Sequence, residues 1–297
     1  IEDWPEFAGV PIEHIQVAPS DRYMALQADR SIYVVDMTDR TIVMARDNAL
    51  LPQRNAFSEA SDALLWVSGR TILSTRFGGF QDQSEERVVY TSPGKRITAM
   101  AASPDQSLLG FHERGGVLRV YDARSGHAAE VETGAPQTNT DILFSPDGQY
   151  VVRAFSDSAV LTDAMTGDES QHHTSGAELS LTGNAVVWKT GSRLYADAYG
   201  DLRIWSLPDG VEQESLPAHR QVVLAMAVHE GDGLLATGSG DATLRIWDLE
   251  SGRQIAQIPA GTGSRTVRSL DFFGGGTKVV AGDSLGSIRV YDLRYLR

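Results

Sequence analysis

Three residues with the groups of a nucleophilic triad lie within a short stretch of the C-terminal half. His219, Thr237 and Asp241 supply an imidazole, a hydroxyl and a carboxylate. A hydroxyl becomes a nucleophile when an imidazole takes its proton and a carboxylate orients that imidazole. The same groups can instead pass a hydrogen bond from one to the next inside a folded core. The elements that position these residues must decide between the two interpretations.

Two other stretches contain residue types that bind ligands. His172-His173 is the only paired histidine, and neighbouring residues of a strand point to opposite faces, so the pair makes a poor metal site alone. The segment FFGGGTK, from Phe272 to Lys278, does not match the phosphate-binding pattern G-x-x-x-x-G-K-[ST]. We interpret the histidine pair as an exposed strand end and the glycine segment as a turn. No metal and no cofactor is expected.

Composition narrows the class of protein further. The chain has 297 residues, of which 41% are hydrophobic, enough for a sizeable core. Its net charge of −13 argues against nucleic-acid binding. The sequence has no apolar run near the roughly 18–20 residues that cross a bilayer. It contains no cysteine, which excludes disulfides, thiolate metal sites and a cysteine nucleophile.

The chain repeats itself about every 42 residues. Aligning it on the residue before the acidic position of TLRIWDL gives six matches: Val35, Tyr121, Thr162, Trp205, Trp247 and Tyr291. The steps from Tyr121 onward are 41, 43, 42 and 44 residues. The step from Val35 to Tyr121 is 86, so a degenerate unit must lie between them, and GRTILSTRF falls there. The period therefore predicts seven units.

Each unit contains the signals of short antiparallel strands. A glycine follows the acidic position by four residues at Gly126, Gly167, Gly210 and Gly252, while Arg40 takes that place in the first unit. Glycine there supplies positive φ at the end of a hairpin loop. The turns APSD, ASPD, FSPDG and EGDG separate runs rich in Val, Ile, Leu and Thr. We expect four strands per unit, stacked radially so that the faces are covered.

The period, the Trp-Asp ending and the SPDG turns resemble the WD-repeat β-propeller family over essentially the whole chain. The resemblance implies an all-β fold, a seven-bladed β-propeller of four-stranded antiparallel blades in one domain, 1–297. The expected blades cover residues 12–46, 52–92, 95–133, 138–174, 176–217, 219–260 and 264–297, the last together with 1–9. Residues near Ile1 to Phe7 are expected to add its fourth strand and close the ring. The SPDG turns and the low lysine count favour a bacterial source.

The resemblance also implies a structural hydrogen-bond network in the sixth unit. It runs from the Trp247 indole to Thr237, then to His219 and to Asp241, so that the hydroxyl faces an indole rather than a substrate. This favours the structural interpretation over a triad. Most other units lack the set: the first keeps Asp29 but has Val35, the third has Phe111, Gly115 and Tyr121, and the seventh has Ala281, Leu285 and Tyr291. We expect those units to depend on apolar packing.

Loops are the expected sites of function. In the family, partners commonly bind the narrow top face, formed by the loops before strand one and after strand two. The residues expected there are Arg30, Arg114, Phe155, Tyr199, His219, Arg220 and Arg265. The segment RFGGFQDQSEER, Arg76 to Arg87, is expected to protrude between strands three and four. In the fifth unit, VVWKTGSRLYAD offers an alternative first hairpin that includes Trp188.

We interpret the chain as a non-enzymatic scaffold, a monomeric cytoplasmic propeller that binds a protein or peptide through its loops. It would not insert into a membrane, and its negative charge favours a partner with a basic surface. The alternative is a propeller domain of a larger signalling, membrane or enzymatic protein, regulatory or extracytoplasmic, whose activity lies elsewhere. The start at Ile1 without a methionine favours that alternative. An enzyme with a site at the central channel is disfavoured because strands such as ITAMAA and VLAMAV are apolar.

Overall fold

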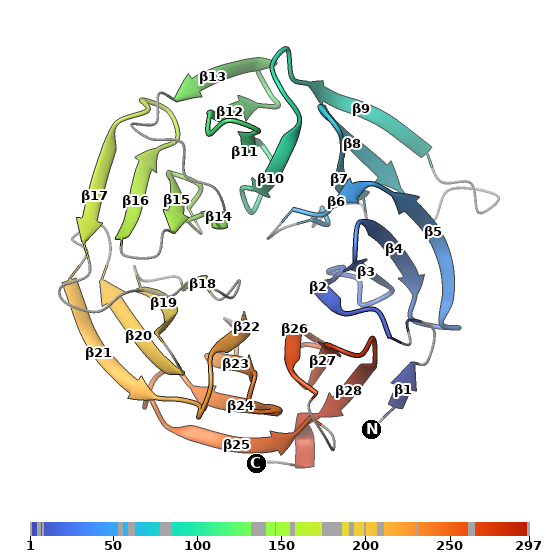
Figure 1. Ribbon diagram of the computed structural model, residues 1–297, viewed down its shortest axis with the longest axis vertical. Helices are drawn as coiled ribbons and strands as arrows, with labels where there is room; N and C mark the ends of the chain where they lie inside the picture. The colour runs from blue at the N-terminus through green and yellow to red at the C-terminus, as the bar shows by residue number, and fades with distance from the viewer. Residues whose placement is uncertain are drawn as a thin grey trace. The chain divides into compact units, whose positions relative to one another are not determined.

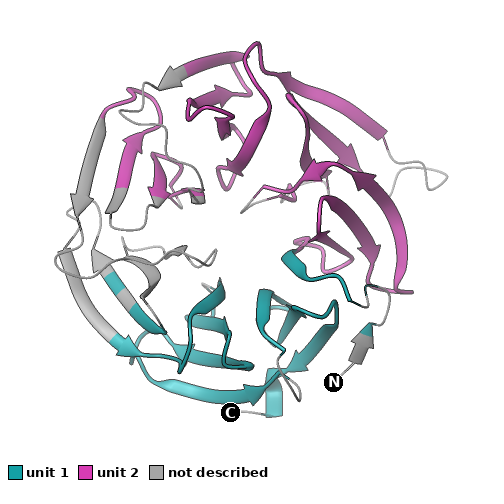
Figure 2. Ribbon diagram, viewed as in Figure 1, with its two compact units in different colours: residues 1–15, 156–158, 172–297 teal, residues 16–155, 159–171 magenta. Residues whose placement is uncertain are grey.

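The structure is a computed structural model. It describes residues 2–4, 7, 9–52, 56–58, 63–77, 85–131, 141–145, 147–154, 158–173, 186–189, 193–198, 200–206, 211–229, 231–260 and 265–295 (Figure 1). Contacts divide the chain into two compact units. Unit 1 comprises residues 1–15, 156–158 and 172–297, and unit 2 comprises residues 16–155 and 159–171 (Figure 2).

Most of unit 2 consists of four sheets of four strands each within the described residues. The first is β2 (Ile12–Val17), β3 (Tyr23–Ala28), β4 (Ser31–Asp36) and β5 (Thr41–Asp47). The second is β6 (Ala49–Leu50), β7 (Ala63–Ser68), β8 (Thr71–Arg76) and β9 (Glu85–Thr91). The third is β10 (Ile97–Ala102), β11 (Leu108–Glu113), β12 (Leu118–Asp122) and β13 (His127–Val131). The fourth is β14 (Asp141–Phe144), β15 (Tyr150–Ala154), β16 (Ser158–Asp163) and β17 (Glu169–His173).

Unit 1 holds three more four-stranded sheets in its described part. The fifth is β18 (Val186–Lys189), β19 (Arg193–Ala198), β20 (Asp201–Ser206) and β21 (Val211–Pro217). The sixth is β22 (Val223–His229), β23 (Leu234–Ser239), β24 (Thr243–Asp248) and β25 (Gln254–Pro259). The seventh is β26 (Val267–Phe273), β27 (Lys278–Asp283), β28 (Ile288–Asp292) and β1 (Glu2–Trp4), and the short 3₁₀ turn η2 (Leu293–Tyr295) follows β28. The predicted all-β class and the predicted seven antiparallel sheets are thus confirmed for the residues described.

The sequence period reappears as a register between the second and third strands of every sheet. The aligned residue of the third strand pairs with an apolar residue of the second: Val35 with Met24, Thr75 with Leu64, Tyr121 with Leu109, Thr162 with Val151, Trp205 with Leu194, Trp247 with Leu235 and Tyr291 with Val279. Thr75 lies inside the segment GRTILSTRF that the period assigned to the degenerate second unit.

The turns between third and fourth strands follow from their acidic residue. In five sheets an aspartate ends the third strand and its carboxylate accepts a backbone N–H of the following turn, as between Asp36 and Thr38 at 2.9 Å and between Asp122 and Arg124 at 2.8 Å. The glycine four residues after the aspartate has positive φ, +72° at Gly126 and +68° at Gly252. Arg40 adopts the same conformation, with φ of +63°, although it carries a side chain.

The N-terminal strand completes the seventh sheet, as the sequence predicted. Glu2 pairs with Val290 and Trp4 with Ile288, so β1 is the fourth strand beside β28. The Gly9 amide donates to the Leu285 carbonyl at 2.8 Å. Trp4 is 5% exposed, and these contacts tie the first residues of the chain to its last hairpin.

The second sheet differs from the expected boundaries. Its first strand is Ala49–Leu50, ahead of the predicted start at residue 52, and it is only two residues long. Asn48, with φ of +54°, turns the chain directly from β5 into β6. In the fifth sheet, β18 and β19 form the hairpin that VVWKTGSRLYAD offered as an alternative, with Trp188 on its first strand.

Neighbouring sheets pack through small residues and aliphatic side chains. In unit 1, Leu234, Ile246 and Phe272 join one cluster between the sixth and seventh sheets. A Cβ on Gly238 would lie 2.3 Å from Val267 Cγ1, so only glycine lets β23 and β26 approach this closely. In unit 2, Leu65, Leu109 and Phe111 join an equivalent cluster between the second and third sheets.

The substitution Trp4→Ala tests the contribution of β1. Removing a buried tryptophan side chain should lower the free energy of unfolding by about 3–5 kcal/mol. Tyr295→Ala is the matched control because Tyr295, near the other end of the chain, is 84% exposed. That change should stay within about 0.5 kcal/mol. Urea unfolding of both variants measures the difference, and equal losses would contradict the docking of β1.

Candidate functional site

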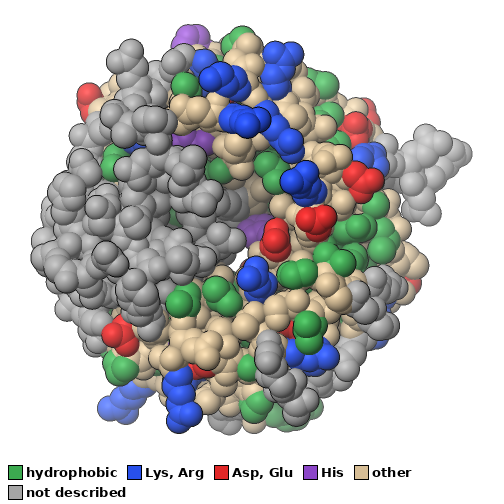
Figure 3. Space-filling model, in the orientation of Figure 1, with side chains coloured by type: hydrophobic (Ala, Val, Ile, Leu, Met, Phe, Trp, Pro, Cys, Tyr) green, Lys and Arg blue, Asp and Glu red, His purple; other side chains and the backbone are tan. Residues whose placement is uncertain are grey.

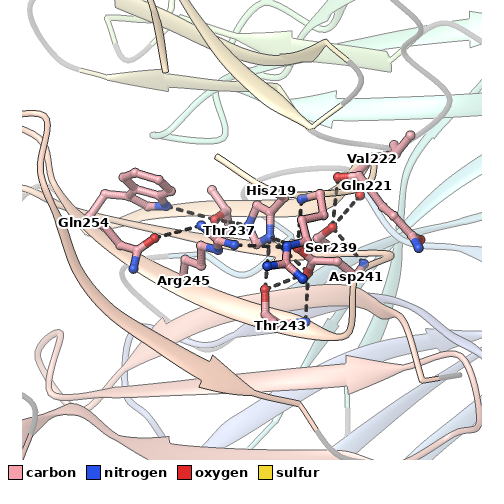
Figure 4. Close-up of polar contacts among 11 residues, drawn as sticks. His219, Gln221, Val222, Thr237, Ser239, Asp241, Thr243, Arg245 and Gln254 are labelled. Atoms are coloured by element: carbon pink, nitrogen blue, oxygen red, sulfur yellow. Dashed lines mark hydrogen bonds and ion pairs between the residues drawn. The ribbon is translucent and has the colours of Figure 1, made fainter. Parts of the chain in front are cut away.

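The four predicted residues of the sixth sheet form one hydrogen-bonded chain (Figure 4). Trp247 Nε1 donates to Thr237 Oγ1 at 3.0 Å, and Thr237 Oγ1 lies 2.8 Å from His219 Nε2. The other ring nitrogen, Nδ1, lies 3.1 Å from Asp241 Oδ2. Because the Thr237 oxygen accepts from the indole, its own proton can be donated to Nε2, and Nδ1–H then donates to the carboxylate.

Asp241 connects this chain to the turn and to the loop before β22. Its carboxylate accepts the Arg220 amide at 3.0 Å and the Thr243 hydroxyl at 2.6 Å. Burial alone would raise the pKa of Asp241, but the hydrogen bonds from Thr243 and the Arg220 amide lower it. The group is therefore an anion that fixes three segments of the sheet to one another.

The network is closed to a substrate. The His219 side chain is 0% exposed, and burial lowers its pKa from 6.5 to about 4 despite the neighbouring Asp241. Thr237 is 0% exposed and its oxygen is occupied by the indole. A nucleophile must reach the atom it attacks, and this hydroxyl reaches none. The arrangement can make the sixth sheet rigid, but it cannot catalyse acyl transfer.

The second sheet contains a related hydrogen bond that sequence reasoning missed. Trp66 Nε1 donates to Thr75 Oγ1 at 3.0 Å. By register, Trp66 on the second strand takes the place of Thr237, and Thr75 on the third strand takes the place of Trp247. The donor and acceptor have exchanged strands, so a search for tryptophan on the third strand alone could not find the pair.

The third and seventh sheets use an acidic residue at the end of the second strand. Glu113 accepts Arg119 Nε at 2.9 Å and is also bonded by the Ser92 hydroxyl. Asp283 accepts Arg265 Nη1 and the Leu285 amide, at 2.9 and 2.8 Å. The sequence signal was present, because both acids precede the aligned tyrosine by eight residues, where the sixth sheet has Ser239. Polar contacts therefore supplement the apolar packing that we expected to hold these sheets.

The residues predicted for a partner-binding face differ in whether their side chains are exposed. Arg30, Arg114 and Arg220 are exposed. His219 is buried in the network, and Arg265 is half-buried and bonded to Asp283 and the Ser287 hydroxyl, so both are engaged within the protein. Phe155 and Tyr199 lie outside the described residues.

A group of cations at one end of the second and third sheets was found only in part from the sequence. We call this the loop end, where the loops before the first strand and after the second strand lie. The exposed cations are Arg70, Lys95, Arg96 and Arg114, here named the cationic loop cluster. Their loops are joined by backbone hydrogen bonds, from Ser92 to Arg70 at 2.9 Å and from Arg114 to Arg96 at 2.8 Å.

The exposed side chains of the cluster carry one sign of charge, because Glu113, which is bonded to the 92–96 loop, is 4% exposed and paired with Arg119. The loops that carry it, residues 69–70, 92–96 and 114–117, contain no aspartate or glutamate. A Cβ on Gly115 would lie 3.1 Å from Lys95 Nζ, which places this ammonium over the Arg114–Gly116 turn. Lys and Arg side chains gather over this part of unit 2 in Figure 3. Of these four residues, only Arg114 was predicted from the sequence, because the other three follow no repeated pattern.

The remaining ligand-like stretches have structural positions. FFGGGTK ends β26 and forms the turn into β27, with φ of +62°, +60° and +78° at its three glycines. His172 and His173 are the last residues of β17. No group of three or more metal-ligating side chains occurs in the described part of the chain. Within that part there is also no helix with the length and apolar character needed to cross a membrane.

Comparison with known proteins gives one family match, which runs from β21 of the fifth sheet to the end of β24 in the sixth. Residues 210–248 match the family described as "WD domain, G-beta repeat". The chain is 27% identical to the COMPASS component SWD3 of Saccharomyces cerevisiae, over 57% of this chain and 54% of that protein. It is 22% identical to WD repeat-containing protein 55 of Mus musculus, over 70% of this chain and 53% of that protein.

A third similarity is to apoptotic protease-activating factor 1 of Rattus norvegicus, 19% identical over 68% of this chain and 16% of that protein. The chain spans about half the length of the yeast and mouse relatives, 54% and 53%. All three proteins are eukaryotic, so the comparison gives no support to the bacterial source expected from the turns and the lysine count.

Thr237→Val tests the network without changing side-chain shape. It leaves the Trp247 indole and His219 Nε2 without their shared partner in a buried site, so the free energy of unfolding should fall by about 2–4 kcal/mol. Thr91→Val is the control, because Thr91 is an exposed residue on β9 whose hydroxyl lies 3.4 Å from that of the half-buried Thr71. Chemical unfolding compares the two, and a loss below about 1 kcal/mol at Thr237 would contradict the network's contribution.

The buried histidines predict a dependence of stability on acid. Burial lowers the pKa of His219 from 6.5 to about 4, and burial together with Arg153 lowers that of His112 to about 4. Between pH 6.5 and about 4 the unfolded chain therefore binds protons that the folded chain does not. The free energy of unfolding should fall as pH drops through this window and should be insensitive to these groups above it. Urea midpoints at pH 7.5, 6 and 5 measure the fall, and an NMR titration of the His219 ring with a midpoint near 6.5 would contradict it.

Proposed function

We propose that the chain is a non-enzymatic scaffold that binds a protein partner through the loop end of its sheets. The observation that carries the proposal is the cationic loop cluster of Arg70, Lys95, Arg96 and Arg114, whose loops are fixed to one another by backbone hydrogen bonds. Arginine is enriched among the residues that dominate binding energy at interfaces. The similarity to WD-repeat proteins, one of them named as a component of a complex, supports the same function.

The proposal includes the arrangement of the sheets. Seven four-stranded sheets, with β1 added to β28, would be the blades of a propeller closed by its N-terminal strand. Such an arrangement presents the loop ends of all sheets on one face, to which exposed Arg30 and Arg220 would contribute. We also propose that this propeller is a monomer and that it acts in the cytoplasm.

The charge of the cationic loop cluster, rather than the net charge of the chain, determines which partner surface can dock there. The net charge of −13 favours a basic partner at long range. At physiological salt, however, charges farther apart than about 8 Å are largely screened, so a docked partner responds to the cations that it touches. The cluster therefore fits an acidic surface, and the expectation of a basic partner does not apply to this end of the molecule.

The absence of enzymatic activity is supported by the triad-like set. His219, Thr237 and Asp241 are occupied with one another and with Trp247 in a buried site. Their chemistry is thus accounted for by the rigidity of the sixth sheet.

A second candidate is a propeller that serves as one part of a larger protein. The match to apoptotic protease-activating factor 1 favours it, because the similar region is 16% of that protein. Under this function the same loops would bind a segment of the larger protein itself. The size of the full gene product discriminates between the two candidates.

The variant R70E/R96E/R114E tests the loop end. Reversing three exposed charges of the cluster should remove the proteins that the wild-type chain recovers from a lysate, measured by quantitative mass spectrometry. The control R40E/R124E/R253E makes the same change in net charge at exposed residues of the turns between third and fourth strands. It should recover the wild-type set, and equal recovery by both variants would refute the assignment.

A further inference from the structure

A groove lies between the second and third sheets at the end opposite the cationic loop cluster. Its volume is about 240 Å³. The floor is formed by Ala63, Leu65 and Leu109, and the rim carries Arg76, Arg87 and Glu85, with Gln106 and Ala123 from the third sheet. All of these residues belong to unit 2.

The groove exists because two positions of the second sheet hold small residues. In the second sheet, the residue opposite the end of the third strand is Ala63, which pairs with Arg76. In the sixth sheet the same position is Leu234, which pairs with Asp248. Ser74 likewise stands where the sixth sheet has Ile246, since Ser74 pairs with Leu65 as Ile246 pairs with Ala236.

In the first, third and sixth sheets the matching residues fill this space. Leu234 and Ile246 belong to the buried cluster between the sixth and seventh sheets, and Tyr23 and Val34 to that between the first and second. In the third sheet Val120 is buried in the same way beside Leu108. The second sheet therefore lacks two side chains at the place where its neighbours pack.

The same sheet also reverses a charge. Five of the third strands end in an aspartate that accepts backbone amides: Asp36, Asp122, Asp163, Asp248 and Asp292. The second sheet has Arg76 at this position. Within the described residues, the guanidinium groups of Arg76 and Arg87 have no hydrogen bond or ion pair, whereas the Arg46 side chain of the same unit forms an ion pair with Glu86.

Arg76 and Arg87 can act together on one ligand. In the backbone register of these two strands, Arg76 lies opposite Glu85 and Arg87 lies opposite Ser74. The two arginines are therefore diagonal neighbours on one face of β8 and β9. Such neighbours lie about 7–8 Å apart, and their Cβ atoms somewhat less, so two long side chains can reach a single carboxylate. Glu85 offsets one of the two positive charges and leaves the rim with a net excess of one.

We propose that this groove binds a short acidic peptide segment of a partner protein. One apolar side chain of the segment lies against the half-buried Val89 and the exposed Ala123, above the buried floor, and an adjacent aspartate or glutamate accepts hydrogen bonds from Arg76 and Arg87. The volume of about 240 Å³ is below the roughly 300–1,000 Å³ typical of small-molecule pockets and suits one or two side chains. The inference concerns a surface distinct from the loop end and stands apart from the proposed function.

The test uses peptides of known sequence selected against this groove. A phage library of random ten-residue peptides is bound to the wild-type chain after depletion on the variant Ser74→Ile, which puts back the side chain of the sixth sheet. Enriched peptides should contain an aspartate or glutamate next to an aliphatic or aromatic residue. Labelled synthetic copies should bind the wild type at least tenfold more tightly than Ser74→Ile in fluorescence anisotropy.

A second variant and a control keep the result interpretable. R76E/R87E changes only exposed side chains and should weaken the same peptides at least tenfold, even if Ser74→Ile disturbs packing. R70E/R96E/R114E should leave their affinity unchanged, which separates this groove from the loop end. Enrichment of peptides without acidic residues, equal affinity for R76E/R87E, or no enrichment at all would overturn the proposal.

Discussion

The register between the second and third strands of each sheet is the constraint on which the rest of the structure depends. A shift by one residue would turn every core side chain of a strand to the opposite face. The aligned residue of the third strand meets an apolar partner in all seven sheets, whether it is Trp247, Tyr291 or Thr75. The clusters between sheets and the position of each loop follow from this pairing.

Polar contacts fix the register in different ways from sheet to sheet. The sixth sheet uses the indole of Trp247 and the buried Thr237, and the second uses Trp66 and Thr75 with the strands exchanged. A hydrogen bond between the same two strands serves equally in either direction, because an indole N–H needs only an acceptor. The third sheet instead places the acid Glu113 at the end of its second strand, bonded to Arg119 on the third.

Sequence could predict what repeats and could not predict what departs from the repeat. The period located the third strand of every sheet, and the likeness of the N-terminal segment to a fourth strand gave the pairing of β1 with β28. The exchange of Trp66 and Thr75 was hidden because their spacing resembles no other unit. The cationic loop cluster was hidden because Arg70 and Arg96 are brought together by loops from different sheets, which no local pattern records. The groove depended on comparing Ser74 with Ile246, and only the register makes that comparison possible.

The second sheet shows why structural and functional residues separate. Trp66 and Thr75 hold its second and third strands together near the middle, and Val67 and Ile72 keep the apolar contact with the third sheet. Because those contacts fix the register, the opposite end of the same strands can lose two core side chains and exchange an aspartate for Arg76 without changing the pairing. A repeated fold is thus stabilised by residues that each sheet must keep in some form. Residues that do not hold the strand register are free to vary, and such residues can bind a ligand. In the described part of unit 2, the residues of the groove and of the cationic loops are of this kind.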